Sequence, residues 1–411
     1  MNKQHPRRNT KSPFLFSHLL EELIPQILLR LPVRSLLRFK TVYKSWHSLI
    51  SDPQFGKSHY DLAASPTYRC LTIANDSEIG SIDVDAPLLN YESSVVKLKY
   101  PLPQPCKLSL FSGNTVWFLG YCRGFVIVVY EQGDVFLWNP STGVHKKFNT
   151  ADVSNDTFDY LHGFGYDTST DDYLVVCMVL IPYDCFEEDP EDVADYPTRI
   201  SYFSLNTNSS FYPEGTYVQY WDNGEREFKV GCLLNEALHW LVTSHETKLQ
   251  VVIAFDLVQR TLSEIPLSPT LSRKLEHKKY RYHLKVMGEC LSLCYPGGGD
   301  SMVEIWVMKE YKVSSSWTKL FVFSTCNIPN NLFSPICLTK DGRIFGSGYG
   351  RLMILNFNGW FLDMCILRPE PDIQKYIDVH HCMYRESLLS LPMTLRKQVK
   401  ASRKQGKTSR K

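Results

Sequence analysis

The sequence predicts an α+β chain of two unequal parts, a small N-terminal helical domain followed by a large all-β domain. Three observations predict it. Between Leu19 and Leu31, apolar residues recur every three or four positions, as on one face of an amphipathic helix. Beyond Pro66 this periodicity gives way to short runs rich in Val, Ile, Phe, Tyr and Trp, separated by turn-forming residues. Similar units in that second part recur at intervals of 46 to 67 residues.

Composition and length fit a folded protein. The chain has 411 residues, of which 44% are hydrophobic and 13% aromatic. No uninterrupted apolar run reaches the roughly 18 residues of a membrane span, so we expect no contact with a membrane. A basic stretch before Phe14-Leu15-Phe16 imitates a signal peptide, but Ser17 and His18 interrupt its apolar part. We therefore expect a cytoplasmic or nuclear protein.

The net charge of +2 is unevenly distributed. Residues 1–15 carry four basic residues before any acidic one, and residues 396–411 carry eight basic residues and no acidic one. Without those twelve charges, residues 12 to 395 carry a net charge of −10, which argues against a specific nucleic-acid-binding domain. We expect both ends to be disordered, the tail being a solvated segment, a nuclear-import signal or a weak contact for a polyanion.

The twelve cysteines are scattered singly, mostly within apolar runs, as is typical of reduced thiols in a core. The nearest approaches to a ligand cluster are Cys290 with Cys294, and His380-His381-Cys382. Neither has the paired CxxC spacing of a zinc site, so we expect no metal and no other cofactor.

The helical domain is predicted as two or three short helices. Ser17 can cap the first, and Pro32 ends it and can open the next, because the first helical turn needs no N–H donor. A second apolar set follows from Val33 to Ile50, and Asp52-Pro53 ends it. So short a domain cannot bury all of this apolar surface within itself. Part of it therefore packs either on a partner or on the rest of the same chain.

The all-β part contains a repeated unit of an apolar strand, a polar turn and a second strand. Its turn positions are spaced by 67, 50, 54 and 46 residues. Such intervals, each with room for about four short strands, are typical of propeller blades and of kelch blades in particular. The region from Tyr68 to Tyr100 supplies either a further blade or only a closing strand. The acidic run from Asp184 to Asp195 is expected in a surface loop. The equivalent turn positions are Asn139, Asn206, Asp256, Glu310 and Asn356.

The sequence contains none of the common catalytic or nucleotide-binding motifs, and no catalytic residue is proposed. The glycine-rich stretch from Pro296 to Asp300 joins two strand-like runs and is interpreted as a hairpin loop. His239 follows an apolar run and is interpreted as a hydrogen-bonded core or turn residue, not as a general base. Four tryptophans in strand-like runs are expected in the core, namely Trp138, Trp240, Trp306 and Trp317.

Residues 16–60 resemble the F-box of plant F-box proteins, whose helices dock on the Skp-type adaptor of a Skp–cullin–F-box (SCF) ubiquitin ligase. The motifs that carry the resemblance are Leu31-Pro32-Val33, the run from Ser35 to Phe39, Lys44-Ser45-Trp46 and the run from Leu49 to Pro53. The family usually has Leu-Pro where Leu19-Leu20 stand and Cys where Tyr43 stands. The resemblance implies adaptor binding through Leu19, Leu23, Ile24, Ile27, Leu28, Leu31, Pro32, Val33, Leu36, Leu37, Val42, Trp46, Leu49 and Ile50.

Residues 67–391 resemble the F-box-associated interaction domain of the same plant proteins, some of which are F-box/kelch-repeat proteins. The matching motifs occur in the family's order, and they include the run from Leu137 to Thr142, the run from Gly163 to Asp167, Ala237-Leu238-His239-Trp240 and the run from Glu304 to Met308. The resemblance implies a non-enzymatic substrate-recognition subunit, which binds the adaptor and, through it, cullin and RING subunits, together with an unknown target protein.

Two alternatives stay open at this stage. The chain could be a β-propeller that binds a small molecule or glycan, or acts as an enzyme, with a degenerate F-box; Leu20 and Tyr43 favour this alternative. It could also sequester the adaptor without delivering a substrate.

Overall fold

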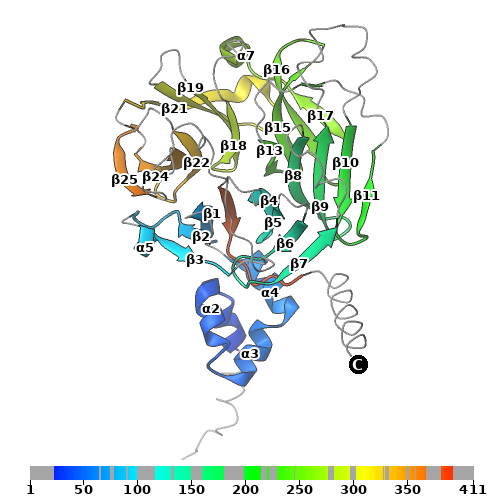
Figure 1. Cartoon of the computed structure of the whole chain (residues 1–411), viewed down its shortest axis with the longest axis vertical. Coiled ribbons are helices and arrows are strands. Elements are labelled where there is room, and N and C mark those ends of the chain that lie inside the picture. Colours follow the sequence, from blue (N-terminus) through cyan, green and yellow to red (C-terminus); the bar gives the residue numbers. More distant parts are fainter. Residues whose placement is uncertain are drawn as a thin grey trace, which may run out of the picture.

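The protein is described by a computed structural model that covers a helical head and a ring of β-sheets (Figure 1). The structure describes residues 23–63, 66–74, 78–88, 91–99, 116–130, 134–149, 160–179, 199–213, 220–221, 229–244, 246–275, 282–296, 302–326, 328, 333–348, 351–356, 358–366 and 381–391.

The helical head consists of helical turns over residues 23–28 followed by α2 (Val33–Phe39), α3 (Lys44–Ile50) and α4 (Pro53–Leu62). Pro32 is the residue immediately before α2, and its carbonyl accepts the first intrahelical hydrogen bonds. Asp52 caps α4, because its side chain accepts from the N–H groups of Gln54 and Phe55, with Pro53 in the first turn. Asp52-Pro53 therefore ends one helix, as predicted, and also begins a further one.

The described strands form six sheets arranged as the blades of a β-propeller, which confirms the predicted fold class (Figure 1). Numbered in chain order, blade 1 contains β1 (Tyr68–Ala74), β2 (Glu78–Asp83), β3 (Val95–Lys97) and β26 (Cys382–Arg385). Blade 2 contains β4 (Val116–Cys122), β5 (Phe125–Tyr130), β6 (Asp134–Trp138) and β7 (His145–Asn149). Blade 3 contains β8 (Tyr160–Asp167), β9 (Asp172–Val179), β10 (Arg199–Ser204), β11 (Ser209–Phe211) and β13 (Lys229–Val230).

The remaining three blades follow the same plan. Blade 4 contains β12 (Tyr220–Trp221), β14 (Cys232–Leu234), β15 (Ala237–Ser244), β16 (Gln250–Asp256) and β17 (Leu262–Ile265). Blade 5 contains β18 (His283–Met287), β19 (Cys290–Pro296), β20 (Met302–Met308) and β21 (Trp317–Ser324). Blade 6 contains β22 (Ser334–Leu338), β23 (Ile344–Gly348), β24 (Arg351–Leu355) and β25 (Phe361–Ile366). In the described part, three short helices accompany the strands, namely α5 (Tyr91–Ser94), α7 (Pro269–Leu275) and η4 (Ser314–Ser316).

The predicted repeat corresponds to the third strand of each of blades 2 to 6 and the turn after it. All five predicted turn positions lie at the end of such a strand or within two residues of it, after β6, β10, β16, β20 and β24. The side-chain oxygens of Asn139, Asp256 and Asn356 accept from the backbone N–H two residues further on, over 2.8–2.9 Å. This local hydrogen bond explains why the repeat is visible in the sequence.

The region from Tyr68 to Tyr100 supplies a sixth blade and not only a closing strand. It contributes β1, β2 and β3, and β26 pairs antiparallel with β1, with Leu71 opposite Cys382. Strands from the two ends of the propeller thus share one sheet, which closes the ring.

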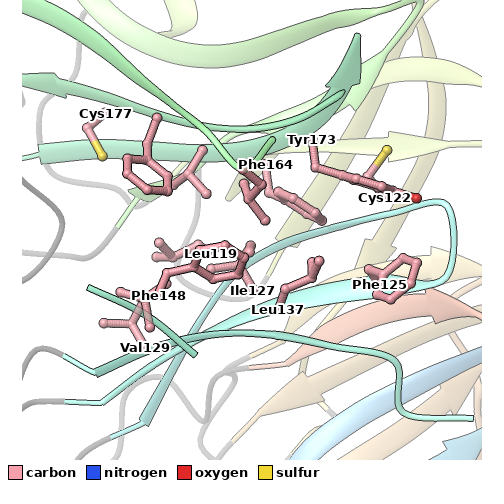
Figure 2. Close-up of a cluster of buried hydrophobic side chains, with 14 of the residues drawn as sticks. Leu119, Cys122, Phe125, Ile127, Val129, Leu137, Phe148, Phe164, Tyr173 and Cys177 are labelled. Atoms are coloured by element: carbon pink, nitrogen blue, oxygen red, sulfur yellow. The ribbon is translucent and has the colours of Figure 1, made fainter. Parts of the chain in front are cut away.

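The core lies between neighbouring blades. Figure 2 shows Leu119, Ile127 and Phe148 of blade 2 facing Phe164 and Tyr173 of blade 3. Trp138, Trp240, Trp306 and Trp317 are at most 8% exposed, which confirms their prediction as core residues. The ten cysteines in the described part are thiols and not disulfides, and six are buried; burial raises the pKa of the Cys122 thiol to about 12. Among the described helices none is long and apolar enough to cross a membrane.

The two faces of the ring differ in their connections. Because successive strands of a blade run antiparallel, turns from the first to the second strand and from the third to the fourth lie on one face, which we call the turn face. Connections from the second to the third strand and from blade to blade lie on the opposite loop face. The predicted acidic loop from Asp184 to Asp195 falls in the connection from β9 to β10, outside the described residues.

Candidate functional site

The head presents a small exposed apolar surface. Of the residues predicted to bind an adaptor, Leu23 is 47% exposed, Ile27 58% and Val42 65%, and Pro32 is also exposed. Leu23 and Ile27 are four residues apart and therefore share one helical face. Tyr43 is 64% exposed beside Val42 in the link between α2 and α3. In the sequence, Tyr43 stands out only as a departure from the family pattern. These side chains are accessible to a partner.

A second part of the predicted set forms the core of the head itself. Leu28, Val33, Leu36 and Ile50 are at most 4% exposed and pack in one cluster with Phe55. Their side chains cannot touch a partner while the head keeps this fold. The apolar pattern of the sequence thus serves two purposes, because one helix face closes the head and the neighbouring face stays exposed.

The rest of the predicted set lies between these extremes. Ile24, Leu31, Leu37, Trp46 and Leu49 are partly buried against the same cluster. The ring of Trp46 lies 5.5 Å from that of Phe39, centre to centre, in a tilted arrangement. Leu19 lies outside the described residues.

The head is basic in its described part. Residues 23–63 contain six Lys or Arg residues and two Asp residues. Basic charge around an exposed apolar surface complements a partner whose docking surface is both apolar and acidic.

In the propeller, His239 of β15 is held between blade 4 and the β20–β21 turn of blade 5. Its Nδ1 lies 3.1 Å from the carbonyl oxygen of Cys232, and its Nε2 lies 2.8 Å from the hydroxyl of Tyr311. A neutral imidazole satisfies both contacts, with Nδ1–H donating to the carbonyl and Nε2 accepting from the hydroxyl. Burial lowers the pKa of His239 to about 4. The interpretation of His239 as a hydrogen-bonded core residue is confirmed.

The buried carboxylate of Glu304 is also engaged within the propeller. Glu304 in β20 accepts from Lys274, Lys319 and the indole Nε1 of Trp306, over 2.8–3.0 Å. Burial opposes ionisation of Glu304, but these donors outweigh it, so its pKa is lowered. The stretch from Pro296 to Asp300, predicted as a hairpin loop, falls between the antiparallel strands β19 and β20, and its residues 297–300 lie outside the described part. No cluster of His, Cys, Asp and Glu in the described part could hold a metal ion.

Asp167 at the end of β8 connects blade 3 to blade 4. Its carboxylate lies 2.6 Å from a guanidinium nitrogen of Arg260 and accepts from Ser169 and Thr170. Burial opposes ionisation, but these hydrogen bonds hold the pKa of Asp167 well below its usual range. The carboxylate therefore has a structural role between the two turns.

A helical head with an exposed apolar surface, joined to a six-bladed propeller, defines a two-part binding protein. Residues 16–58 match the F-box domain, and residues 71–355 match the F-box associated beta propeller domain. The chain belongs to the family of F-box proteins that carry this propeller domain.

Several plant F-box proteins are similar to most of this chain. The chain is 29% identical over 331 residues to the F-box/kelch-repeat protein At3g23880 of Arabidopsis thaliana, covering 76% of this chain and 81% of the relative. It is 26% identical over 345 residues to the F-box protein CPR1 of the same plant, covering 78% and 77%.

Solved structures resemble the ring more remotely. TolB from Acinetobacter baumannii aligns with a TM-score of 0.39 and 10% identity, over 78% of this chain and 67% of TolB. The SapL1 lectin in complex with alpha methyl fucoside aligns with a TM-score of 0.37 and 11% identity, over 74% of this chain and 98% of the lectin. At this level of similarity we infer nothing about function from them.

Proposed function

We propose that this protein is the substrate-recognition subunit of an SCF ubiquitin ligase. The head would dock the Skp-type adaptor and thereby cullin and RING subunits, while the propeller would bind a target protein for ubiquitination. The observation that carries the proposal is the exposed apolar surface of Leu23, Ile27 and Val42 on a domain that matches the F-box. The kelch type of the blades and a cytoplasmic or nuclear location are part of the same proposal.

The role requires no chemistry from this chain. Holding a target near a ubiquitin-charged enzyme raises the effective concentration of the target's lysines and limits their orientation, which accelerates transfer. The loop face offers the longer connections of the propeller, and such connections commonly form the binding surface of a repeat array. We therefore place the target on the loop face.

His239, Glu304 and Asp167 are all engaged within the fold, so none of these three residues supports the enzyme alternative. The third alternative, sequestration of the adaptor without a target, shares the same head surface. The two are distinguished by ubiquitin transfer to a bound target, which the proposed function requires and sequestration does not.

The test uses exposed head residues. We expect the double variant Ile27→Asp/Val42→Asp to reduce pull-down of a recombinant plant Skp-type adaptor at least tenfold without changing the thermal unfolding midpoint, since both side chains are more than half exposed. Leu36→Asp is unsuitable, because it places a carboxylate in the core of the head.

The matched control is Leu362→Asp, which changes a residue that is 48% exposed on β25 of the propeller. It should bind the adaptor like the unaltered chain. Failure of the unaltered chain to bind the adaptor would contradict the proposal.

A further inference from the structure

The chain does not end where the ring closes. After β26 it continues through residues 386–391, which we call the bridging segment, and this segment contacts the helical head as well as blades 1, 2 and 3. Besides the covalent link after α4 and the contacts of Tyr60 in α4 with Arg123 and Arg385, the head is thus attached to the propeller through a segment more than 300 residues further along the chain.

On the head side, the bridging segment completes the hydrophobic core. Leu388 is 7% exposed and packs in the cluster formed by Leu28, Val33, Leu36, Ile50 and Phe55. The approach to α4 is close, because a Cβ added to Gly56 would lie 3.0 Å from the carbonyl oxygen of Leu388. One side chain of the propeller's own C-terminal extension is therefore part of the core of the head.

An ion pair accompanies this apolar contact. The Glu386 carboxylate lies 3.1 Å from Nε of Arg34 in α2 and 3.6 Å from Nε of Arg69 in β1. The side chains of Glu386 and Arg69 are 5% and 3% exposed, whereas that of Arg34 is 46% exposed. The buried carboxylate thus joins one cation of the head to one cation of blade 1.

On the propeller side, the bridging segment is held by blade 2. The side-chain amide of Asn139, which is fully buried, donates to the carbonyl oxygens of Ser387 and Leu389 over 3.2 and 2.9 Å. Leu389 and Leu391 pack in the core between blades 2 and 3. The segment therefore has fixed contacts on both sides.

We propose that the bridging segment sets the orientation of the adaptor-binding head relative to the propeller, with Glu386 and Leu388 as positioning residues. A single covalent link leaves two domains free to rotate, whereas a second attachment through a hydrophobic core removes that freedom. The attachment itself does not depend on the proposed function. Its consequence, a fixed distance from the adaptor to the target, rests on the proposed function.

The first experiment cuts the covalent link. A protease site is inserted between Leu62 and Pro66 of the full chain, and the cleaved protein is analysed by size-exclusion chromatography. We expect the head fragment to elute with the propeller in the unaltered chain and with Leu362→Asp, and to separate from it with Leu388→Asp. If head and propeller elute separately after cleavage of the chain that carries no substitution, the proposal is overturned. This outcome does not depend on whether a variant folds.

The second experiment measures orientation in the uncut chain. Fluorophores attached through unnatural side chains at the exposed residues Ser48 of α3 and Lys309 of blade 5 report the distance from head to propeller. We expect a narrow distance distribution that broadens with Leu388→Asp and is restored with Leu388→Met. An equally narrow distribution with Leu388→Asp would contradict the positioning role. Absence of adaptor binding by the unaltered chain would instead count against the proposed function, so the two failures are distinguishable.

Discussion

The guanidinium carbon of Arg385 lies 3.8 Å from the centre of the Tyr60 ring. Arg385 is the last residue of β26, and Tyr60 belongs to α4, so this contact joins the closing strand of the propeller directly to the head. The guanidinium carbon of Arg123, in the turn after β4, lies 5.3 Å from the centre of the same ring. The ring of Tyr60 therefore makes cation–π contacts with two arginines from two different blades.

Replacement of Tyr60 tests whether the aromatic ring carries this contact. We expect Tyr60→Phe to leave the free energy of unfolding nearly unchanged, because phenylalanine keeps the ring face. Tyr60→Leu should lower it by about 1–2 kcal/mol, since it removes both cation–π contacts. Urea unfolding followed by tryptophan fluorescence provides the measurement. An equal loss for the two variants would show that the hydroxyl, not the ring, is the stabilising group.

Asn139 and Asn356 provide a matched pair for the bridging segment. Both residues accept turn hydrogen bonds through Oδ1, but only Asn139 donates to the bridging segment in the described structure. Asn139→Asp should lower the free energy of unfolding by about 1–3 kcal/mol, because it removes two donations in a buried site. Asn356→Asp keeps the turn acceptor and should cost less than half as much. Equal costs in denaturant titrations would contradict a special role of Asn139.

His239 predicts a dependence of stability on pH. Burial holds its pKa in the folded protein at about 4, below the ordinary value of about 6.5 in an unfolded chain. As the pH falls below about 6.5, the unfolded state therefore takes up more protons than the folded state. The contribution of His239 to stability is complete above that pH and is lost on approaching pH 4.

The corresponding experiment compares the unaltered chain with His239→Gln, whose side chain does not titrate. Between pH 7 and pH 4.5 the free energy of unfolding of the unaltered chain should fall by about 2 kcal/mol more than that of the variant. Urea titrations at the two pH values measure this difference. If the free energy of unfolding falls equally in the two proteins, the pKa of His239 in the folded protein is close to its ordinary value.

Much of the architecture could be predicted from local patterns. Turn positions such as Asn139 and Asp256 are visible in the sequence because a side-chain oxygen bonds to a backbone N–H only two residues away. Core tryptophans were identifiable from their strand-like surroundings, and the head from its apolar periodicity. Each of these signals depends on near neighbours in the chain.

The apolar pattern of the helical head does not distinguish its buried members from its exposed ones. Leu36 and Ile27 look alike in the sequence, yet Leu36 is fully buried and Ile27 is 58% exposed. Which helix face is covered depends on how the helices cross and on Leu388, which enters the head from the far end of the described chain. No local pattern around Leu388 indicated that contact.

The sequence by itself determined the type of each part, a helical head and a repeated β domain, because amphipathic periods and turn chemistry act over a few residues. Only the tertiary structure decided how the ring closes and how the head is attached to it. Both depend on pairs separated by more than 300 residues, such as Leu71 with Cys382 and Arg34 with Glu386. Such pairs are selected by the packing of the whole chain, since many other apolar or charged residues could satisfy the same local pattern.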